Sequence, residues 1–135
     1  MSRKQQRKGA NGEKELTIIL QGKGYNAQRG GSQTYGTIPD IVGLPGIHIE
    51  VKRREKLDML GAIRQAQTDS ERFKDGLPAI FHRSNRSPWL VTMTLEEWLV
   101  LYERGHRTIQ KGDICGNLQE KGGVYGADNK TAEST

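Results

Sequence analysis

The uneven distribution of large apolar residues along the chain is what most limits how it can fold. Leu, Ile, Val and Phe make up 28 of the 135 residues. None lies in residues 1–15, 24 lie in residues 16–103, and four lie in the last 32 residues. Because a folded core is built mainly from such side chains, we expect one domain over residues 11–104. We expect a basic N-terminal arm over residues 1–10 and a polar, glycine-rich tail over residues 105–135 that is mobile or loosely docked.

Basic side chains outnumber acidic ones, and the excess is concentrated in two short segments. The chain has 21 Lys and Arg against 16 Asp and Glu, which gives a formal net charge of +5. One basic segment is residues 1–15 and the other runs from Lys52 to Lys56. This pattern suits contacts with the phosphates of a nucleic acid, although a solvated charged surface is the simpler explanation of charge alone.

The cysteine and histidine contents argue against a disulfide-rich or zinc-stabilised protein. Cys115 is the one cysteine, and His48, His82 and His106 lack the spacing of zinc ligands. No apolar run approaches the roughly 18 residues of a membrane-spanning helix, and the N-terminus is polar rather than signal-like. We therefore expect no membrane association and a cytoplasmic location, which is the host cytoplasm if the chain is phage-encoded.

Periodicity and capping signals predict a mixed α/β domain with a small central sheet. Helices are expected over residues 11–22, 58–73 and 95–103, and strands over residues 25–29, 38–42, 47–51, 79–82 and 89–93. Asn11 is the expected N-cap of the first helix, and Thr94 with Glu97 forms a capping box for the last. Four aromatic residues in apolar stretches are expected in the core: Phe81, Trp89, Trp98 and Tyr102.

Three polar residues on the second and third strands form a candidate catalytic group. Residues 47–51 alternate apolar and polar, which predicts a half-buried strand with Glu50 and Lys52 side by side on its other face. Asp40 lies near the end of the preceding strand, so hairpin pairing brings two carboxylates and an ammonium together. Such oxygens suit Mg²⁺ or Mn²⁺, and the group suits phosphodiester hydrolysis. Acidic and lysine residues at this loose spacing are nevertheless common on exposed strands.

The chain resembles the PD-(D/E)XK nuclease superfamily, specifically the small archaeal and phage-type Holliday junction resolvases. The resemblance spans roughly residues 7–93 and rests on Arg7-Lys8-Gly9-Ala10 with Glu13, Glu15 and Leu16, on Gly31-Ser32, on Pro39-Asp40, on Ile49-Glu50-Val51-Lys52 and on Gln65. It implies a restriction-endonuclease-like αβββαβ core, in which a small mixed central sheet is flanked by helices.

The resemblance also implies roles for individual residues. The implied catalytic residues are Glu13, Asp40, Glu50, Lys52 and Gln65, and the implied metal ligands are Asp40, Glu50, the Val51 carbonyl and Glu13. Helical spacing independently aims Glu13 towards the sheet, because it precedes Leu16 and Leu20 by three and seven residues. Glu15 is expected to face solvent. Gln67 is the alternative to Gln65, and His48 is expected to be exposed or to lie behind the ligands.

The hypothesis that follows is a Mg²⁺-dependent endodeoxyribonuclease that cuts branched DNA, with four-way junctions as the favoured substrate and Mn²⁺ as a substitute ion. The residues expected to contact DNA are Arg7, Lys8, Arg29, Ser32, Arg53, Arg54, Lys56, Arg83 and Arg86. A homodimer is expected, with the apolar face of the last helix as its candidate interface. Two alternatives stay open: the same nuclease fold acting on flaps, replication-repair or packaging intermediates, and a non-catalytic nucleic-acid-binding module.

Overall fold

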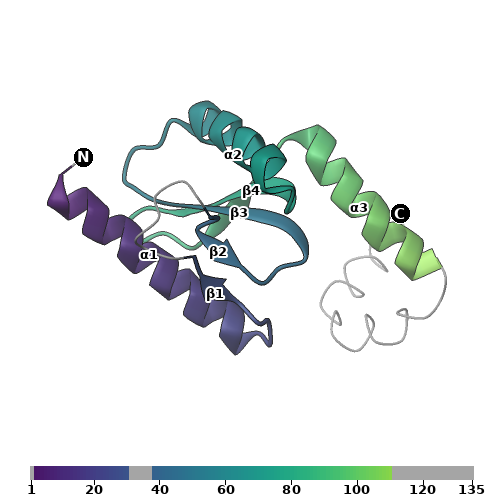
Figure 1. Cartoon of the computed structure of the whole chain (residues 1–135), viewed down its shortest axis with the longest axis horizontal. Helices are drawn as coiled ribbons and strands as arrows, with labels where there is room; N and C mark the ends of the chain where they lie inside the picture. The colour runs from purple at the N-terminus through teal and green to yellow at the C-terminus, as the bar shows by residue number, and fades with distance from the viewer. Residues whose placement is uncertain (1, 31–37, 111–135) are drawn as a thin grey trace, which may run out of the picture. The chain divides into compact units, whose positions relative to one another are not determined.

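The computed structural model describes residues 2–30 and 38–110 and shows a five-stranded mixed sheet with three helices (Figure 1). The elements in chain order are α1 (Arg3–Gly22), β1 (Gln28–Arg29), β2 (Ile41–Val42), β3 (Gly46–Arg53), α2 (Met59–Phe73), β4 (Gly76–Arg83), β5 (Leu90–Thr92) and α3 (Leu95–Gln110). The predicted αβββαβ order is confirmed. Ser32 and residues 111–135 of the expected tail lie outside the described residues.

The sheet has the strand order β1-β2-β3-β4-β5, with β3 and β4 at its centre. These two strands are parallel, and α2 makes the crossover between them; the other neighbouring pairs are antiparallel. Figure 1 shows α1 and α2 on opposite sides of the strands. The chain divides between Glu97 and Trp98 into two compact units, and the first unit holds the whole sheet together with α1 and α2.

The first helix starts eight residues earlier than predicted. Ser2, not Asn11, is its N-cap: the Ser2 hydroxyl accepts a hydrogen bond from the Gln5 main chain, and the Gln5 side chain accepts one from the Ser2 main chain. This reciprocal capping box satisfies two otherwise unpaired N–H groups. The expected basic arm is therefore largely helical, because residues 3–10 belong to α1.

Strand β3 is buried on both faces, so the expectation of a half-buried strand was wrong. Ile49 and Val51 pack with Leu16 and Leu20 of α1 in one core cluster. The other face of β3 carries His48 and Glu50, which are also buried. A central strand in a parallel pair is covered on both faces by helices, which explains why its polar residues lose contact with solvent.

The second helix and the β4–β5 hairpin agree with the sequence prediction, apart from their bounds. Asp58 caps α2, and Ala62 and Ala66 of α2 pack against Ile80 of β4 in a second core cluster. Lys74 ends the helix in a left-handed conformation, and β4 begins at once at Gly76. These contacts hold α2 against the two central strands.

The last helix is longer and less covered than predicted. It runs seven residues beyond Glu103, so residues 105–110 of the expected tail are helical. The Thr94 hydroxyl accepts a hydrogen bond from the Glu97 N–H, as the capping signal predicted. Trp98 and Tyr102 are 46% and 52% exposed, which contradicts their expected place in the core. Their rings stack on one another along one side of α3, with centroids 5.3 Å apart. Within the described residues, no helix is both long and apolar enough to cross a membrane.

Candidate active site

A cleft of about 880 Å³ collects the residues that the sequence singled out for chemistry. It is bounded by α1, by the segments around β1 and β2, by the C-terminal half of β3 and by α2. Its lining includes Glu13, Asp40, Glu50, Val51, Lys52 and Gln65. Residues separated by more than 50 positions in the chain therefore meet in one concave surface, which is the usual setting of a binding or catalytic site.

The pairing of β2 with β3 brings the two predicted metal-binding carboxylates together. Ile41 is opposite Ile49 in an antiparallel ladder, so Asp40 and Glu50 emerge next to each other. The Val51 main-chain N–H donates a hydrogen bond of 3.0 Å to the Asp40 carboxylate. This bond fixes Asp40 against β3 while one carboxylate oxygen stays available for another contact.

Lys52 links the strand residues to α2. Its Nζ lies 3.3 Å from Oε1 of Glu50 and donates a hydrogen bond of 3.2 Å to Oε1 of Gln65. The structure thus brings Gln65 to Lys52, whereas Gln67 bonds to Glu97 at 2.9 Å. The ammonium is held between a carboxylate and an amide oxygen in the lining of the cleft.

Glu13 reaches the cleft from α1, as its spacing from the buried leucines predicted. It is half-buried and forms an ion pair with Arg29 of β1 at 3.3 Å. Asp40 is close enough to repel its charge. Glu13 therefore belongs to the same acidic group as the strand carboxylates.

Burial and mutual repulsion make these carboxylates reluctant to ionise together. Burial, reinforced by the neighbouring Asp40, raises the pKa of Glu50 from 4.5 to about 7, although Lys52 opposes the shift. Burial also raises the pKa of Asp40 against the lowering effect of the Val51 hydrogen bond. The pKa of Glu13 is raised by burial and by Asp40, with Arg29 opposing. A cation placed among these oxygens would relieve the repulsion and favour their ionised forms.

The donor set fits a hard divalent cation. Asp40 and Glu50 offer carboxylate oxygens, the Val51 carbonyl adds a neutral oxygen, and Glu13 adds a third carboxylate at the same cleft. Magnesium takes oxygen ligands almost exclusively and is commonly held by only one or two protein carboxylates. A site of this kind suits metal-assisted phosphoryl transfer.

Comparison with known protein families assigns the chain to one of them. The family model described as archaeal Holliday junction resolvase (Hjc) matches residues 4–112, which is most of the chain. The chain belongs to this resolvase family. It is accordingly a junction-resolving nuclease and a metal-dependent endonuclease, as the resemblance predicted.

A solved resolvase is also similar in structure. It is Hjc from Archaeoglobus fulgidus, described as a Holliday junction resolvase from an archaeal hyperthermophile. The two chains are 26% identical, the match covers 62% of this chain and 70% of that one, and the TM-score is 0.47. No curated protein sequence matches the chain.

Five of the cations predicted to contact DNA line the cleft of the resolvase, namely Lys8, Arg29, Arg53, Arg54 and Lys56. Arg7, Arg83 and Arg86 do not contribute to its lining. Arg54 and Lys56 are exposed at the rim, where a phosphate could reach them. Arg29 and Lys8 are already paired with acidic side chains, so a phosphate would compete with Glu13 and Glu55 for them.

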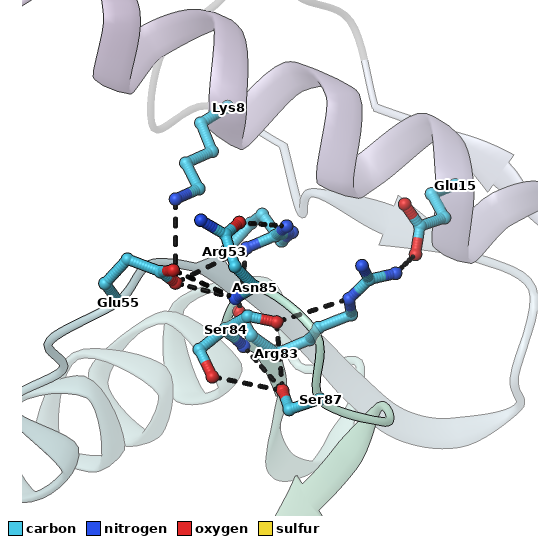
Figure 2. Close-up of polar contacts among 8 residues, drawn as sticks. All are labelled: Lys8, Glu15, Arg53, Glu55, Arg83, Ser84, Asn85 and Ser87. Atoms are coloured by element: carbon cyan, nitrogen blue, oxygen red, sulfur yellow. Dashed lines mark hydrogen bonds and ion pairs between the residues drawn. The ribbon is translucent and has the colours of Figure 1, made fainter.

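A polar network ties α1 to the end of β3 and to the β4–β5 turn (Figure 2). Glu55 lies 3.6 Å from the Lys8 ammonium and 3.8 Å from the Arg53 guanidinium, and it accepts a hydrogen bond from the Asn85 N–H. Arg53 also donates to the Asn85 side chain at 2.8 Å. These contacts hold the two basic segments of the sequence next to each other.

Glu15 was expected to face solvent; its side chain is 39% exposed, but it also has two partners in the fold. Its carboxylate forms an ion pair with Arg83 and accepts a hydrogen bond of 2.8 Å from the Trp89 indole N–H (Figure 2). Arg83 is the last residue of β4 and Trp89 directly precedes β5, so both are more than 65 residues from Glu15 in the sequence. Helical spacing places Glu15 beside a different neighbour from Glu13, but it carries no information about that long-range partner.

His48, which was expected to be exposed or to lie behind the ligands, is buried beside the site, and sequence reasoning missed its carboxylate partner. His48 is 1% exposed, and its Nδ1 lies 2.8 Å from a carboxylate oxygen of Asp75. Its position two residues before Glu50 places both side chains on the same face of β3, and this spacing is the signal that could have revealed it. Asp75 follows α2 and could not have been paired with His48 from the sequence.

Proposed function

We propose that the protein resolves four-way DNA junctions by Mg²⁺-dependent hydrolysis of phosphodiester bonds, with Mn²⁺ able to replace Mg²⁺. The proposed ligands are the Asp40 and Glu50 carboxylates and the Val51 carbonyl, with Glu13 as a further carboxylate. The observation that carries the proposal is the convergence of Asp40, Glu50 and Lys52 at one end of β3, inside a cleft rimmed by cations.

Each residue of the site has a distinct part in this reaction. A bound Mg²⁺ supplies Lewis-acid chemistry, because it polarises the phosphoryl group and lowers the pKa of bound water. Lys52 orients the attacking water and offsets the negative charge that develops on the phosphoryl oxygens. Gln65 positions Lys52 through the 3.2 Å hydrogen bond to its Nζ. The water oxygen then attacks the phosphorus and loses its proton to solvent. The P–O bond to one of the two linked nucleotides breaks, and the oxygen of that leaving nucleotide takes up a proton.

The cations around the cleft provide the contacts to the DNA backbone. Arg54 and Lys56 follow β3 directly and stand beside the acidic group, while Lys8 approaches from α1. We also keep Arg7, Arg83 and Arg86, which do not line the cleft, as predicted DNA contacts. Ser32, which is not among the described residues, stays a predicted contact as well. Phosphate contacts of this kind give affinity that falls steeply with salt and is insensitive to base sequence.

A homodimer would give the two active sites that cutting both strands of a junction requires. The exposed apolar side chains of α3, including Trp98, Leu99 and Tyr102, support this helix as the candidate interface. Contiguous apolar surface on a helix is commonly covered by a partner. Four-way junctions arise in the DNA inside cells, and we infer an intracellular location on that ground.

A cleavage panel tests the proposed function. The full chain is incubated with a four-way junction, a flap and a plain duplex of matched length, in Mg²⁺ and in EDTA. We expect cleavage of the junction in Mg²⁺ alone and little cleavage of the duplex. Preferred cutting of the flap would assign the same chemistry to another substrate, and salt-sensitive binding without cleavage in Mg²⁺ or Mn²⁺ would indicate a binding module.

A further inference from the structure

His48 is a buried imidazole whose orientation is fixed from one side. Both carboxylate oxygens of Asp75 lie within 2.9 Å of its Nδ1. Because a carboxylate can only accept, Nδ1 carries the proton in this contact. The ring also stacks on Phe73, with centroids 6.1 Å apart and planes at 19°. The other ring nitrogen, Nε2, is therefore directed to a defined place.

That nitrogen has no hydrogen-bond partner within residues 2–30 and 38–110, although it is fully buried. Oε2 of Glu50 lies 3.9 Å from it, which is too long for a hydrogen bond. An unpaired polar atom in a buried position is costly, and native structures seldom leave one without a reason. A ligand for the Nε2 lone pair would supply that reason.

The two oxygens of Glu50 face different neighbours. Oε1 lies 3.3 Å from the Lys52 ammonium, on the side of the proposed catalytic cation. Oε2 faces Nε2 of His48. Asp69 of α2 lies near both His48 and Glu50. One ligand atom from each of the three residues lies within 4.8 Å of the other two. Glu50 is thus placed to bridge two positions.

We propose that His48 Nε2, Glu50 Oε2 and the Asp69 carboxylate form a second divalent-metal site, next to the catalytic cation, that takes Zn²⁺ or a similar transition ion. An imidazole that binds a metal usually donates its other N–H to a carboxylate, which is the arrangement of Asp75 and His48. One nitrogen and two carboxylate oxygens suit Zn²⁺ and leave a position for water. Mg²⁺ disfavours the nitrogen.

Occupation of this site changes the spacing of its ligands. Zinc bonds of about 2.1 Å place neighbouring tetrahedral ligands roughly 3.4 Å apart, so the three side chains move inward when the ion binds. The bridging Glu50 is then held in its ionised form between the two positions. Two-metal sites with ions about 3.5–4 Å apart share a carboxylate in this way. The second site depends on the fold and not on the proposed junction cleavage.

The test follows the histidine nitrogens directly. The full chain, labelled with ¹⁵N in histidine and freed of metal with EDTA, is titrated with Zn²⁺ at neutral pH and compared with Mg²⁺ by ¹H–¹⁵N correlation spectroscopy. We expect the Nε2 resonance of His48 to shift and to saturate at one equivalent of Zn²⁺, with no such shift in Mg²⁺. An Nε2 that carries a proton and ignores Zn²⁺ would show an ion pair with Glu50 and would overturn the proposal.

Variants assign the ligands. Zn²⁺ affinity should fall roughly 10–100-fold in Asp75→Asn, because the amide is a weaker partner for Nδ1–H. His48→Gln should lose the site, whereas the matched His106→Gln should keep it. Asp40→Asn should keep the Zn²⁺-induced shift of His48 even though it loses cleavage. Loss of that shift in Asp40→Asn would place the ion at the catalytic position and would overturn the proposal. A wild-type chain that binds Zn²⁺ at His48 but cuts no junction would contradict the proposed function alone.

Discussion

The Asp40 carboxylate accepts a 3.0 Å hydrogen bond from the main-chain N–H of Val51, the residue between Glu50 and Lys52. This contact links Asp40, which directly precedes β2, to Val51 of β3, and it sets the positions of the proposed metal ligands. It also removes one oxygen of Asp40 from solvent without neutralising the charge. The hydrogen bond therefore serves the site's geometry, while burial still raises the pKa of the carboxyl.

Replacing Asp40 by Asn should remove Mg²⁺-dependent cleavage without destabilising the fold. The amide oxygen can still accept from Val51, so we expect the melting temperature in EDTA to stay close to that of the wild type. Loss of the carboxylate charge should reduce Mg²⁺-dependent junction cleavage by at least about 1,000-fold, since metal and charge stabilisation carry the reaction. Junction binding in EDTA should be retained. Glu71→Gln, which removes an exposed acid of α2, is the control; wild-type cleavage by Asp40→Asn would exclude Asp40 as a ligand.

The raised pKa of Glu50 predicts an unusual dependence of stability on pH when no divalent cation is present. A carboxyl with a folded-state pKa of about 7 and an ordinary value of 4.5 binds more protons when folded than when unfolded between those pH values. Its contribution to stability is present below pH 4.5 and is lost as pH rises through about 7. The loss is on the order of 3 kcal/mol. Burial is the largest cause of the raised pKa, Asp40 and Asp69 add to it, and Lys52 opposes it. His48 also faces Glu50, with Nε2 3.9 Å from Oε2.

Urea unfolding in EDTA at pH 4.5 and pH 8 measures this effect. Glu50→Gln should match the wild type at pH 4.5 and should exceed its free energy of unfolding at pH 8. Mg²⁺ added at pH 8 should stabilise the wild type and leave Glu50→Gln unchanged. Parallel pH profiles for the two proteins would show that Glu50 ionises normally in the folded chain.

The ammonium of Lys52 should matter for catalysis and little for DNA affinity. It contacts Glu50 and Gln65 inside the cleft rather than the exposed rim. We expect Lys52→Gln to lower kcat for junction cleavage by about 100-fold or more, because a charge positioned for the transition state is removed. Gln65→Leu should lower kcat less, since the amide only positions Nζ. A larger change in the Kd for the junction than in kcat would reassign Lys52 to binding.

The ion pair between Glu15 and Arg83 should stabilise the fold without affecting catalysis. Glu15→Ala leaves the Arg83 guanidinium and the Trp89 indole N–H without their shared acceptor, which should cost about 1–3 kcal/mol of unfolding free energy. Glu103→Ala removes an acid from the exposed pair with Arg107 and should cost less than about 0.5 kcal/mol. Urea denaturation measures the free energy of unfolding of both variants and of the wild type. Equal effects would mean that the Glu15 network is no stronger than a surface pair.

Local sequence signals predicted strands β2 and β3 and the proximity of Asp40, Glu50 and Lys52, because strand alternation and hairpin pairing are short-range properties. They could not predict that β3 is covered on both faces, since this depends on the parallel partner β4 and on α2. The same reason explains why the partners of Glu15 and His48 were not predicted, since these partners are distant in sequence. The start of the first helix was misplaced because Asn11 is a favourable N-cap residue type, whereas in the structure Ser2 and Gln5 form the capping box.

Close packing of α1 on β3 should make Gly12 intolerant of any side chain. A Cβ at this position would lie 2.7 Å from Cβ of Arg53, an atom close to the backbone that cannot move aside cheaply. Gly12→Ala should therefore lower the free energy of unfolding by about 1–3 kcal/mol, as overpacking does. At Gly9 a new Cβ would meet no atom of the described residues within 4 Å, apart from its chain neighbours and the backbone of its own helix. The same change there should raise the free energy of unfolding by up to about 1 kcal/mol through helix propensity.

The two glycines lie in one helix, three residues apart, so the pair isolates packing from propensity. Chemical denaturation of both variants measures the opposite signs, and junction cleavage measures the consequence for the site. Because α1 carries Glu13 into the cleft, a shift of the helix in Gly12→Ala should also lower cleavage. Stabilisation by both substitutions would show that α1 does not pack against β3 at Gly12.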